Sequence, residues 1–405
     1  MSALYGAAST AFDAIARPMP SQDASLKQLS ERVRAAAAAR TPLRLRGGGS
    51  KDFYGQTLQG EVLDLSAWRG IVSYEPSELV VTVRAGTPLH ELEAALEEKG
   101  QYLAFEPPHF AGHATGQTTC GGMVAAGLSG PARASVGSLR DFVLGVTLLN
   151  GRAELLTFGG QVIKNVAGYD VSRLMVGALG TLGLLTEISL KVLPTAPAET
   201  TLACQGLNQQ GALDLLNRWG AQPLPLNASC WLTDTQVQAP RSQLLLRLRG
   251  AAAAVEAACP RLLADLQAHG GEATRIDKAQ AALSWLGCRN QTLPFFQAPS
   301  PELGLWRLSL PQTAPALDLP HAQLVEWHGA QRWLWAPLSA MAQLRQTAAQ
   351  VGGSATLFRA PASGVTGTAP RFDPLSVPLA AIQHRLKQEF DPAGIFNPGR
   401  LYAQW

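Results

Sequence analysis

The sequence predicts an α+β protein with a glycine-rich first half and a second domain of ferredoxin-like pattern. Three observations support this prediction. Helix-like and strand-like segments alternate from the start, an Asn-Gly dipeptide joins two strand-like runs at residues 142–158, and strands and helices replace the glycine clusters beyond residue 198. With 405 residues, 46% of them hydrophobic and 16% charged, the chain can form roughly two to three buried domains.

The first half is expected to begin with a helix and to continue mainly as strands. A helix is predicted over residues 25–40, because Ser25 can open a capping box and Pro42 follows the alanine-rich run. Residues 142–158 predict a hairpin, and Asn150 and Gly151 suit the positive φ angles of a type I′ turn. The other expected elements are a short strand before residue 47, strands at 62–65, 70–74, 79–84 and 184–192, and a helix between residues 87 and 100.

Two stretches rich in proline and small residues divide the chain. Residues 194–198 are the first expected boundary, so that residues 1–197 form one domain and residues 198–365 form a second, cap domain. Residues 361–370 precede a last helix and a C-terminal segment, 366–405. The elements expected in the cap are strands at 244–249, 305–310, 324–327, 332–335 and 355–359 and helices at 251–266, 279–286 and 341–350, in an order that resembles the βαββαβ ferredoxin-like motif.

Three glycine clusters in the first half predict a site for an extended anionic ligand. They are RLRGGGSKDFYG (44–55), ATGQTTCGGMVAAGLSG (114–130) and VGALGTLG (176–183). Glycine lets backbone N–H groups approach a diphosphate without a Cβ in the way, and Lys51 adds positive charge. Tight turns explain any one cluster equally well, but three clusters together favour one shared ligand.

Several other classes of ligand do not match the sequence. The nicotinamide G-x-G-x-x-G fingerprint fails because its third glycine falls at Asp52, and a Walker loop fails because Arg400 replaces the required lysine. The 33 basic and 30 acidic residues form no long runs, which gives no reason to expect nucleic acid. The five cysteines are scattered, without the C-x-x-C pairs of iron–sulfur or zinc sites, as is typical of a reducing cytoplasm.

The protein is expected to be cytoplasmic. Its start does not match a signal peptide, and no stretch approaches about 18 uninterrupted apolar residues. Any association with the inner membrane is therefore expected to be peripheral and to depend on partner proteins.

Five segments together resemble the FAD-linked oxidases of the vanillyl-alcohol oxidase and p-cresol methylhydroxylase type. They are RGGGS, TTCGGMVAAGLSGP, VGSLRDFVLGVTLLNG, GYDVSRLMVGALGTLGLLTEISLKVLP and FDPAGIFNPGRL, and they cover about half of the sequence. The resemblance implies a two-subdomain FAD-binding domain, a ferredoxin-like cap domain and a C-terminal segment that returns to the FAD domain.

The same resemblance implies which residues hold FAD. Residues 46–51 would wrap the pyrophosphate, residues 118–127 and 136–141 would line the isoalloxazine and ribityl groups, and residues 177–188 would meet the adenosine. Ser50 stands where several relatives carry the histidine that bonds to the flavin, so noncovalent FAD is expected. The expected FAD-binding residues are Arg46, Gly47, Gly48, Gly49, Ser50, Lys51, Pro107, Thr118, Thr119, Gly121, Gly122, Ala125, Gly137, Ser138, Asp141, Gly180, Gly183, Ile188 and Arg400.

Residues 164–183 and 326–335 are most similar to flavoprotein subunits of bacterial complexes that oxidise 2-hydroxy acids. This implies two-electron oxidation of glycolate, or of a related 2-hydroxy acid, to the 2-oxo acid. The implied partners are a homologous FAD-containing subunit and an iron–sulfur subunit that receives the electrons. Related D-lactate and 2-hydroxyglutarate dehydrogenases that consist of one subunit carry an HGDGNLH-like cluster, which this sequence lacks. The alternatives are a non-catalytic scaffold or regulatory subunit and, less favoured, a stand-alone oxidase.

Oxidation of a 2-hydroxy acid needs a cation for the carboxylate and a base for the hydroxyl proton. The candidates are Arg332, His328 and Arg359 in the cap, Asn397 and Arg400 in the tail, and Cys120. For the cap residues, the favoured alternative is that His328 is a turn residue and that the arginines are solvated. For Asn397 and Arg400, ligand binding and anchoring of the chain are equally supported. For Cys120, a packing role is favoured. The pair His109 and His113 is not expected to bind metal, because Pro108 disfavours a helix there. No catalytic residue and no metal ligand is therefore assigned.

Overall fold

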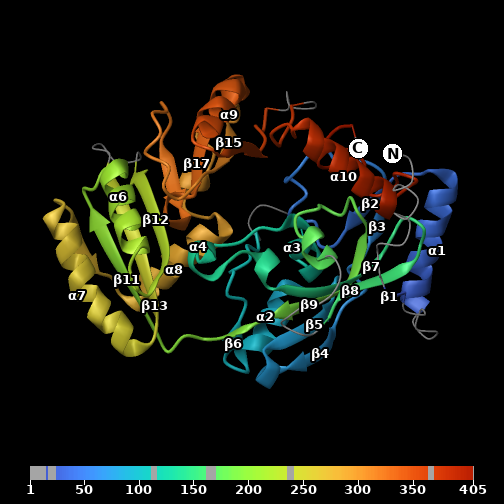
Figure 1. Ribbon diagram of the computed structural model, residues 1–405, viewed down its shortest axis with the longest axis horizontal. Coiled ribbons are helices and arrows are strands. Elements are labelled where there is room, and N and C mark those ends of the chain that lie inside the picture. Colours follow the sequence, from blue (N-terminus) through green and yellow to red (C-terminus); the bar gives the residue numbers. More distant parts are fainter. Residues whose placement is uncertain are drawn as a thin grey trace, which may run out of the picture.

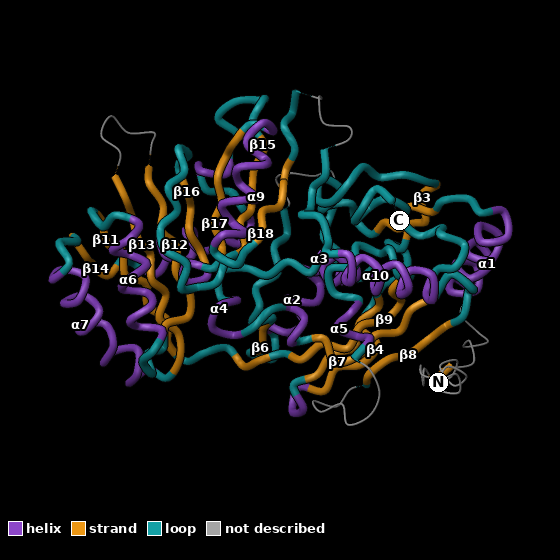
Figure 2. Tube along the Cα trace, turned by 45° about the horizontal axis from the view of Figure 1, so that its top comes forward, coloured by secondary structure: helices purple, strands orange, loops and turns teal. Residues whose placement is uncertain are grey.

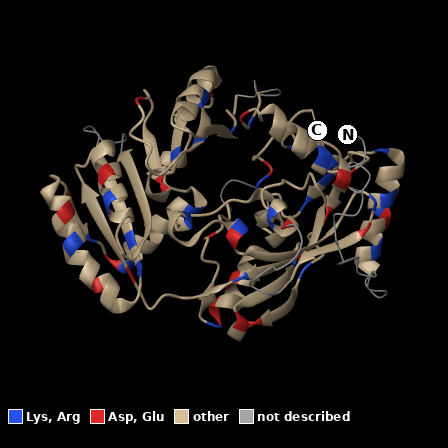
Figure 3. Cartoon of the chain, viewed as in Figure 1, with Lys and Arg blue, Asp and Glu red and all other residues tan. Residues whose placement is uncertain are grey.

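The computed structural model describes residues 15–16, 24–110, 116–160, 170–234, 241–363 and 369–404. Two sheet-based halves lie side by side (Figure 1). Figure 3 shows basic and acidic residues interspersed over both of them. Among the described helices, none has the length and apolar composition that crossing a bilayer requires.

The first half is built on a six-stranded antiparallel sheet with the order β1-β8-β7-β9-β5-β4. Its strands are β1 (Ile15–Ala16), β4 (Ile71–Glu75), β5 (Val80–Arg84), β7 (Val143–Leu149), β8 (Leu155–Gly159) and β9 (Leu184–Lys191). Two smaller pairs flank it: parallel β2 (Leu43–Arg46) with β3 (Glu61–Asp64), and antiparallel β6 (Gln101–Tyr102) with β10 (Leu193–Pro194). The helices are α1 (Ala24–Ala39), α2 (Leu89–Glu97), α3 (Cys120–Ala126), α4 (Arg133–Val136) and α5 (Val171–Leu174).

Helix α1 confirms the helix predicted over residues 25–40 and shows why it forms. Its buried residues Leu26, Leu29, Val33 and Ala36 recur every three or four positions, which places them on one helical face. That face packs into the same core as the strands of the first sheet. The helix is thereby fixed beside β2, from which the first glycine cluster continues.

The hairpin predicted at residues 142–158 is confirmed as β7 and β8, but the type I′ turn is wrong. A type I′ turn needs a positive φ at both central residues, whereas Ala153 is the one residue of this turn with a positive φ (58°). The Asn150 side-chain oxygen instead accepts hydrogen bonds from the backbone N–H groups of Arg152 (2.9 Å) and Glu154 (3.0 Å). Side-chain capping by asparagine therefore replaces the expected backbone geometry.

The second half is an eight-stranded antiparallel sheet with the order β14-β11-β13-β12-β16-β17-β15-β18. One ferredoxin-like unit comprises β11 (Ala198–Gln205), α6 (Gln209–Gly220), β12 (Leu226–Asp234), β13 (Arg241–Gly250), α7 (Ala252–Ala268) and β14 (Glu272–Arg275). The second comprises β15 (Gly304–Ser309), β16 (Gln323–Glu326), β17 (Gln331–Ala336), α9 (Met341–Gln350) and β18 (Ser354–Arg359). Strands β12 and β16 pair and join the two units edge to edge, while α8 (Lys278–Asn290) connects them along the sequence.

The two faces of the eight-stranded sheet have different neighbours. Helices α6 and α7 cover the outer face of the first unit, and α9 covers that of the second (Figures 1 and 2). The inner face packs against α8 and against Tyr54, Phe110 and Leu179 of the first half, in one shared hydrophobic core. The inner face of the sheet is therefore the wall that the second half presents to the first.

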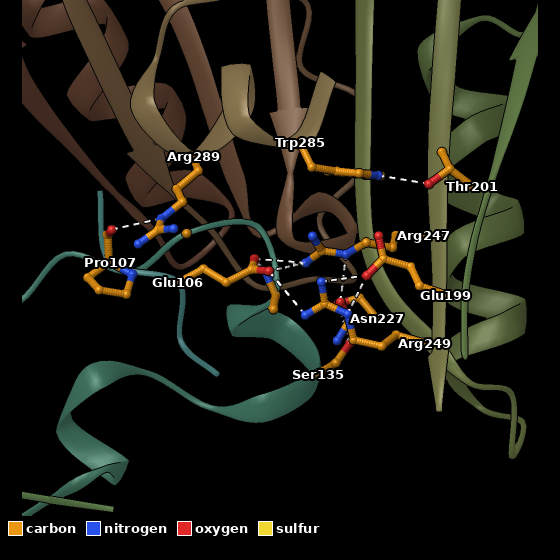
Figure 4. A network of polar contacts seen from close by, with 12 residues as sticks. Glu106, Pro107, Ser135, Glu199, Thr201, Asn227, Arg247, Arg249, Trp285 and Arg289 are labelled. Atoms are coloured by element: carbon orange, nitrogen blue, oxygen red, sulfur yellow. Dashed lines mark hydrogen bonds and ion pairs between the residues drawn. The ribbon is translucent and has the colours of Figure 1, made fainter. Parts of the chain in front are cut away.

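A buried polar network also fixes the two halves to each other (Figure 4). Glu106 of the first half accepts hydrogen bonds from Arg247 (2.7 Å) and Arg249 (3.2 Å) on β13, and Arg249 also pairs with Glu199 (2.5 Å). Close by, Arg289 on α8 donates to the Pro107 carbonyl (2.9 Å). Paired charges of this kind set the position of the second half over residues 105–110.

Residues after the second sheet return to the first half. Helix α10 (Val377–Phe390) lies across it in Figure 1, and Phe390, Ile395 and Phe396 are buried in its core. The ammonium group of Lys387 donates to Asp391 (2.6 Å) and to the carbonyls of Thr181 (2.7 Å) and Phe396 (2.9 Å). This segment thereby reaches the third glycine cluster.

Candidate functional site

A cleft in the first half lies where the three glycine clusters meet. Its walls are residues 45–52, residues 119–126 and residues 179–185, with Asn397 and Arg400 completing it from the C-terminal segment. Most of the residues expected to bind FAD line this cleft: Arg46, Gly47, Gly48, Gly49, Ser50, Lys51, Thr119, Gly121, Gly122, Ala125, Gly180, Gly183 and Arg400.

The other expected residues lie outside the lining of the cleft. Thr118 is adjacent to it, and its hydroxyl is hydrogen-bonded to that of Ser50 (2.8 Å). Ser138 and Asp141 bond to each other, and Gly137 (φ 97°) ends α4. Pro107 offers its carbonyl to Arg289, and Ile188 is fully buried in the core on β9.

The first two glycine clusters touch backbone to backbone, which explains why glycine is needed. A Cβ on Gly47 would lie 2.2 Å from the Thr119 hydroxyl oxygen, and one on Gly48 would lie 1.5 Å from the Gln117 carbonyl oxygen. Both distances are far inside van der Waals contact, so a larger residue would displace the Thr119 side chain at position 47 and the backbone at position 48. The glycines therefore allow the two loops to pack directly against each other beside the cleft.

The cleft contains a lysine that pairs with no carboxylate among the described residues. The Lys51 ammonium group is held by the hydroxyls of Ser50 (3.2 Å) and Thr118 (3.3 Å), and within the described ranges it forms no ion pair with a carboxylate. Burial lowers the pKa of Lys51 to about 7. The Nε atom of Arg46 is buried without a hydrogen-bond partner, although Asp52 lies 3.5 Å away. A glycine cradle with an orphaned donor and an unpaired ammonium group is suited to a phosphate-containing ligand.

Asn397 and Arg400 hold the cleft together while lining it. The Asn397 side chain accepts from the Leu45 N–H (2.8 Å) and donates to the Leu179 carbonyl (2.7 Å), so it links the first and third clusters. The Arg400 guanidinium donates to the carbonyls of Asp52 (3.0 Å), Tyr54 and Gln56, and burial lowers its pKa to about 10. Of the two roles left open by the sequence, chain anchoring is the one that these contacts perform.

Neither of the arginines expected to be solvated is exposed: Arg332 is buried and Arg359 is half-buried. Arg332 is on the outer face, where it donates to the carbonyls of Ala314 (2.8 Å) and Pro315 (2.7 Å). Arg359 is on the inner face, stacked against Phe53 and Phe110 with its charge 5.4 and 5.9 Å from their ring centroids, and burial lowers its pKa to about 10. The expectation of solvated arginines was therefore wrong, because β17 and β18 are packed on both faces.

The remaining sequence candidates have structural roles. The His328 ring contacts the hydroxyls of Ser229 (2.9 Å) and Ser135 (3.3 Å), and burial lowers its pKa to about 4. Cys120 is fully buried and burial raises the pKa of its thiol, so it stays protonated and packs in the core.

No metal site is apparent in the part of the chain that the structure describes. The described ranges contain no group of three side chains suited to hold a metal ion. His109 pairs with Glu93 (2.7 Å), whereas His113 lies outside the described residues.

A second, smaller cavity lies between the halves. The inner face of the eight-stranded sheet forms one wall, and residues 108–110 and 128–130 form the other. It contains Arg307 of β15 and Glu326 of β16, two residues that sequence reasoning missed. The available signal was the alternation along β15, which places Arg307 on the same face as Leu305.

Known proteins resemble this chain both in part and along nearly its whole length. A family model described as an FAD binding domain matches residues 22–159. Glycolate oxidase subunit GlcE of Escherichia coli (strain K12) is 45% identical over 376 residues, which are 93% of this chain and 97% of the relative. Glycolate oxidase subunit GlcD of Bacillus subtilis (strain 168) is 31% identical over 165 residues, 40% of this chain and 34% of the relative.

A solved structure of alkyldihydroxyacetonephosphate synthase has a similar fold. It superposes with a TM-score of 0.65 and 14% identity over 92% of this chain and 74% of the other. At this identity the likeness shows the fold alone, and it confirms the expected fold class.

Proposed function

Because the chain belongs to the family of FAD-linked oxidases that includes glycolate oxidase subunit GlcE, and is an FAD-dependent oxidoreductase of that family, we propose that it is the FAD-binding subunit of a 2-hydroxy-acid oxidising complex. The substrate is glycolate or a close relative, and the product is the 2-oxo acid. Electrons leave through an iron–sulfur subunit, beside a second, homologous FAD-containing subunit. The observation that supports this most is the cleft of three glycine clusters with its unneutralised Lys51.

The residues of the cleft fit FAD. Gly47 and Gly48 let the first two glycine loops pack against each other along the cleft, and Lys51 and the unpartnered Nε of Arg46 would neutralise a pyrophosphate there. Residues 119–126 would lie along the flavin, and residues 179–185 along the adenosine. Ser50 offers no nitrogen for a bond to the flavin, so the cofactor is noncovalent. When bound, FAD supplies the two-electron acceptor of the reaction.

A second candidate function is a non-catalytic subunit that keeps the FAD-type fold and supports a catalytic homologue. The observation that favours it is the missing HGDGNLH-like cluster, which related dehydrogenases of one subunit carry. The two functions differ in whether substrate reduces the flavin of this chain.

A spectroscopic experiment separates them. The purified protein should show a flavin spectrum, either as isolated or after reconstitution with FAD, and acid denaturation should release the chromophore into solution. Anaerobic glycolate should then bleach the visible band. Bound flavin that is not bleached, even with partner subunits added, would favour the scaffold. A protein that cannot be loaded with FAD would contradict the proposal altogether.

A further inference from the structure

The cavity between the two halves brings together side chains from neighbouring strands. Strand β17 lies between β15 and β16, so that Arg307 is opposite Trp333, and Gln331 is opposite Glu326. Side chains alternate between the faces of a strand, so these four residues share the inner face. All four line the cavity.

Glu326 is a carboxyl group in an unusual setting. It is 3% exposed, and one of its oxygens accepts hydrogen bonds from the indole N–H of Trp333 (2.7 Å) and the amide of Gln331 (3.1 Å). Within the described ranges no lysine or arginine forms an ion pair with it. Burial raises the pKa of Glu326 to about 7, although the two hydrogen bonds oppose this shift. A carboxyl group that exchanges a proton near neutral pH is suited to act as a general base.

Arg307 provides the complementary cation. Its guanidinium donates to the Tyr54 hydroxyl (3.2 Å) and lies 5.7 Å from the ring centroids of Tyr54 and Phe358. Its Nε atom is buried without a hydrogen-bond partner, and it forms no ion pair in the part of the chain that the structure describes. Arginine with free donors in apolar surroundings is suited to bind a carboxylate through two parallel hydrogen bonds.

We propose that this cavity is the substrate subsite of the protein, in which Arg307 holds the carboxylate of a small 2-hydroxy acid and Glu326 accepts its hydroxyl proton. This inference rests on the proposed function and assigns residues to it. The proton passes from the substrate hydroxyl to the Glu326 carboxylate, and the carbon–oxygen single bond becomes the carbonyl of the 2-oxo acid. FAD held in the cleft would supply the acceptor for the hydride that leaves the same carbon with both electrons. Aromatic walls formed by Trp327, Trp333 and Phe358 favour a substrate without a large side chain.

The test compares two variants with matched controls. Glu326→Gln and Arg307→Met change the cavity, whereas Glu256→Gln and Arg275→Met remove an ion pair between exposed side chains of α7 and β14. Binding of oxalate, a non-reacting dicarboxylate, is measured on the FAD-loaded protein by isothermal titration calorimetry. Flavin reduction by glycolate is measured anaerobically by stopped flow, and unfolding is measured for all four variants.

The two cavity variants should have different effects. Arg307→Met should weaken oxalate binding by about 10–100-fold, the usual loss for a charge-assisted hydrogen-bond pair. Glu326→Gln should bind oxalate within about twofold of the unchanged protein and reduce its flavin about 10²–10⁴-fold more slowly. Unchanged oxalate affinity in Arg307→Met, unchanged reduction in Glu326→Gln, or no binding of oxalate to the unchanged protein would each overturn the inference.

A measurement on the unchanged protein is independent of how the variants fold. Flavin reduction should accelerate as the pH rises through about 7, because Glu326 must be unprotonated to accept a proton. Among the described residues, the other titratable or charged groups that face it are Cys230 of β12, Cys288 and Arg289 of α8, Arg307 of β15 and the more distant Glu106. A rate that does not rise with pH would contradict the role of Glu326. If glycolate fails to reduce the flavin while the affinity for oxalate still depends on Arg307, the proposed oxidation is contradicted and the carboxylate subsite is supported.

Discussion

Glu106 is expected to be the most important single charge for holding the two halves together. Its carboxylate is 2.7 Å from Arg247, whose side chain is only 3% exposed, and 3.2 Å from Arg249. Glu106→Gln keeps the size of the side chain but leaves Arg247 buried without its negative partner. Breaking one partner of a buried ion pair costs about 3–5 kcal/mol, a large part of the roughly 5–15 kcal/mol that stabilises a typical domain.

The pH dependence of this effect has a defined sign. Burial alone raises the pKa of Glu106, but Arg247 and Arg249 outweigh it and hold the pKa below its usual value of 4.5. Because the pKa is depressed in the folded state, the stabilisation is present above the unfolded pKa and is lost as the pH falls through the folded pKa. The difference between the unchanged protein and Glu106→Gln should therefore shrink below pH 4.5.

Urea unfolding followed by tryptophan fluorescence, at pH 7 and in steps below pH 4.5, measures the effect. Glu61→Gln is the matched control, since Glu61 pairs with Arg32 at 2.6 Å but the two side chains are 66% and 37% exposed. The Glu61→Gln substitution should lower the free energy of unfolding by no more than about 1 kcal/mol. The reasoning would be refuted if both variants lost the same free energy of unfolding, or if the loss in Glu106→Gln did not change with pH.

Three further predictions concern the cleft. Gly48→Ala places a Cβ 1.5 Å from the Gln117 carbonyl oxygen, so it should cost about 1–3 kcal/mol of FAD binding or stability; titration of apoprotein with FAD checks this, and unchanged binding and stability would contradict it. The affinity of the unchanged protein for FAD should fall as the pH rises through about 7, because Lys51 loses its charge there. Lys51→Met should bind FAD more weakly at pH 6 and should not show this fall. A pH profile of FAD affinity parallel to that of the unchanged protein would exclude Lys51 as the titrating group. Asn397→Ala leaves the Leu45 N–H unpaired and should cost about 1–3 kcal/mol in the free energy of unfolding, which chemical denaturation measures; no loss would show that the link is unimportant.

The sequence predicted the glycine-rich half better than the second half. Expected strands correspond to β3, β4, β5 and β9, because each is a short run bounded by turn residues. In the second half, β11, α6 and β12 were missed, and one ferredoxin-like unit was expected where there are two. Strand β11 has four consecutive buried residues, so the alternation that identifies a strand is lost where both faces are covered.

The candidate site was likewise predicted well in the first half of the protein and poorly in the second. The glycine clusters were recognised because a close backbone approach leaves a local signature in the sequence. For Arg307 the alternation along β15 is a weak signal, but what distinguishes both Arg307 and Glu326 is which face of a strand they occupy and what packs against it. Arg332 was named among the candidates and Arg307 was not, although β17 directs Arg332 to the outer face. A shift of one residue along a strand reverses the face, so composition alone cannot select between two arginines.

The hydrogen bonds by which Asn397 links the first and third glycine clusters also bear on when the cleft forms during folding. Its partner Leu45 lies 352 residues earlier in the sequence, and the partner of Arg400 at Tyr54 lies 346 residues earlier. Closing a contact of such separation costs more chain entropy than pairing nearer neighbours, so we expect these contacts to form late in folding. While residues 391–400 are still inside the ribosome, the glycine loops of the nascent polypeptide lack the hydrogen bonds that Asn397 and Arg400 make. We therefore expect a polypeptide truncated before residue 391 to bind FAD more weakly than the full sequence, because it lacks the contacts of Asn397 and Arg400 with the cleft.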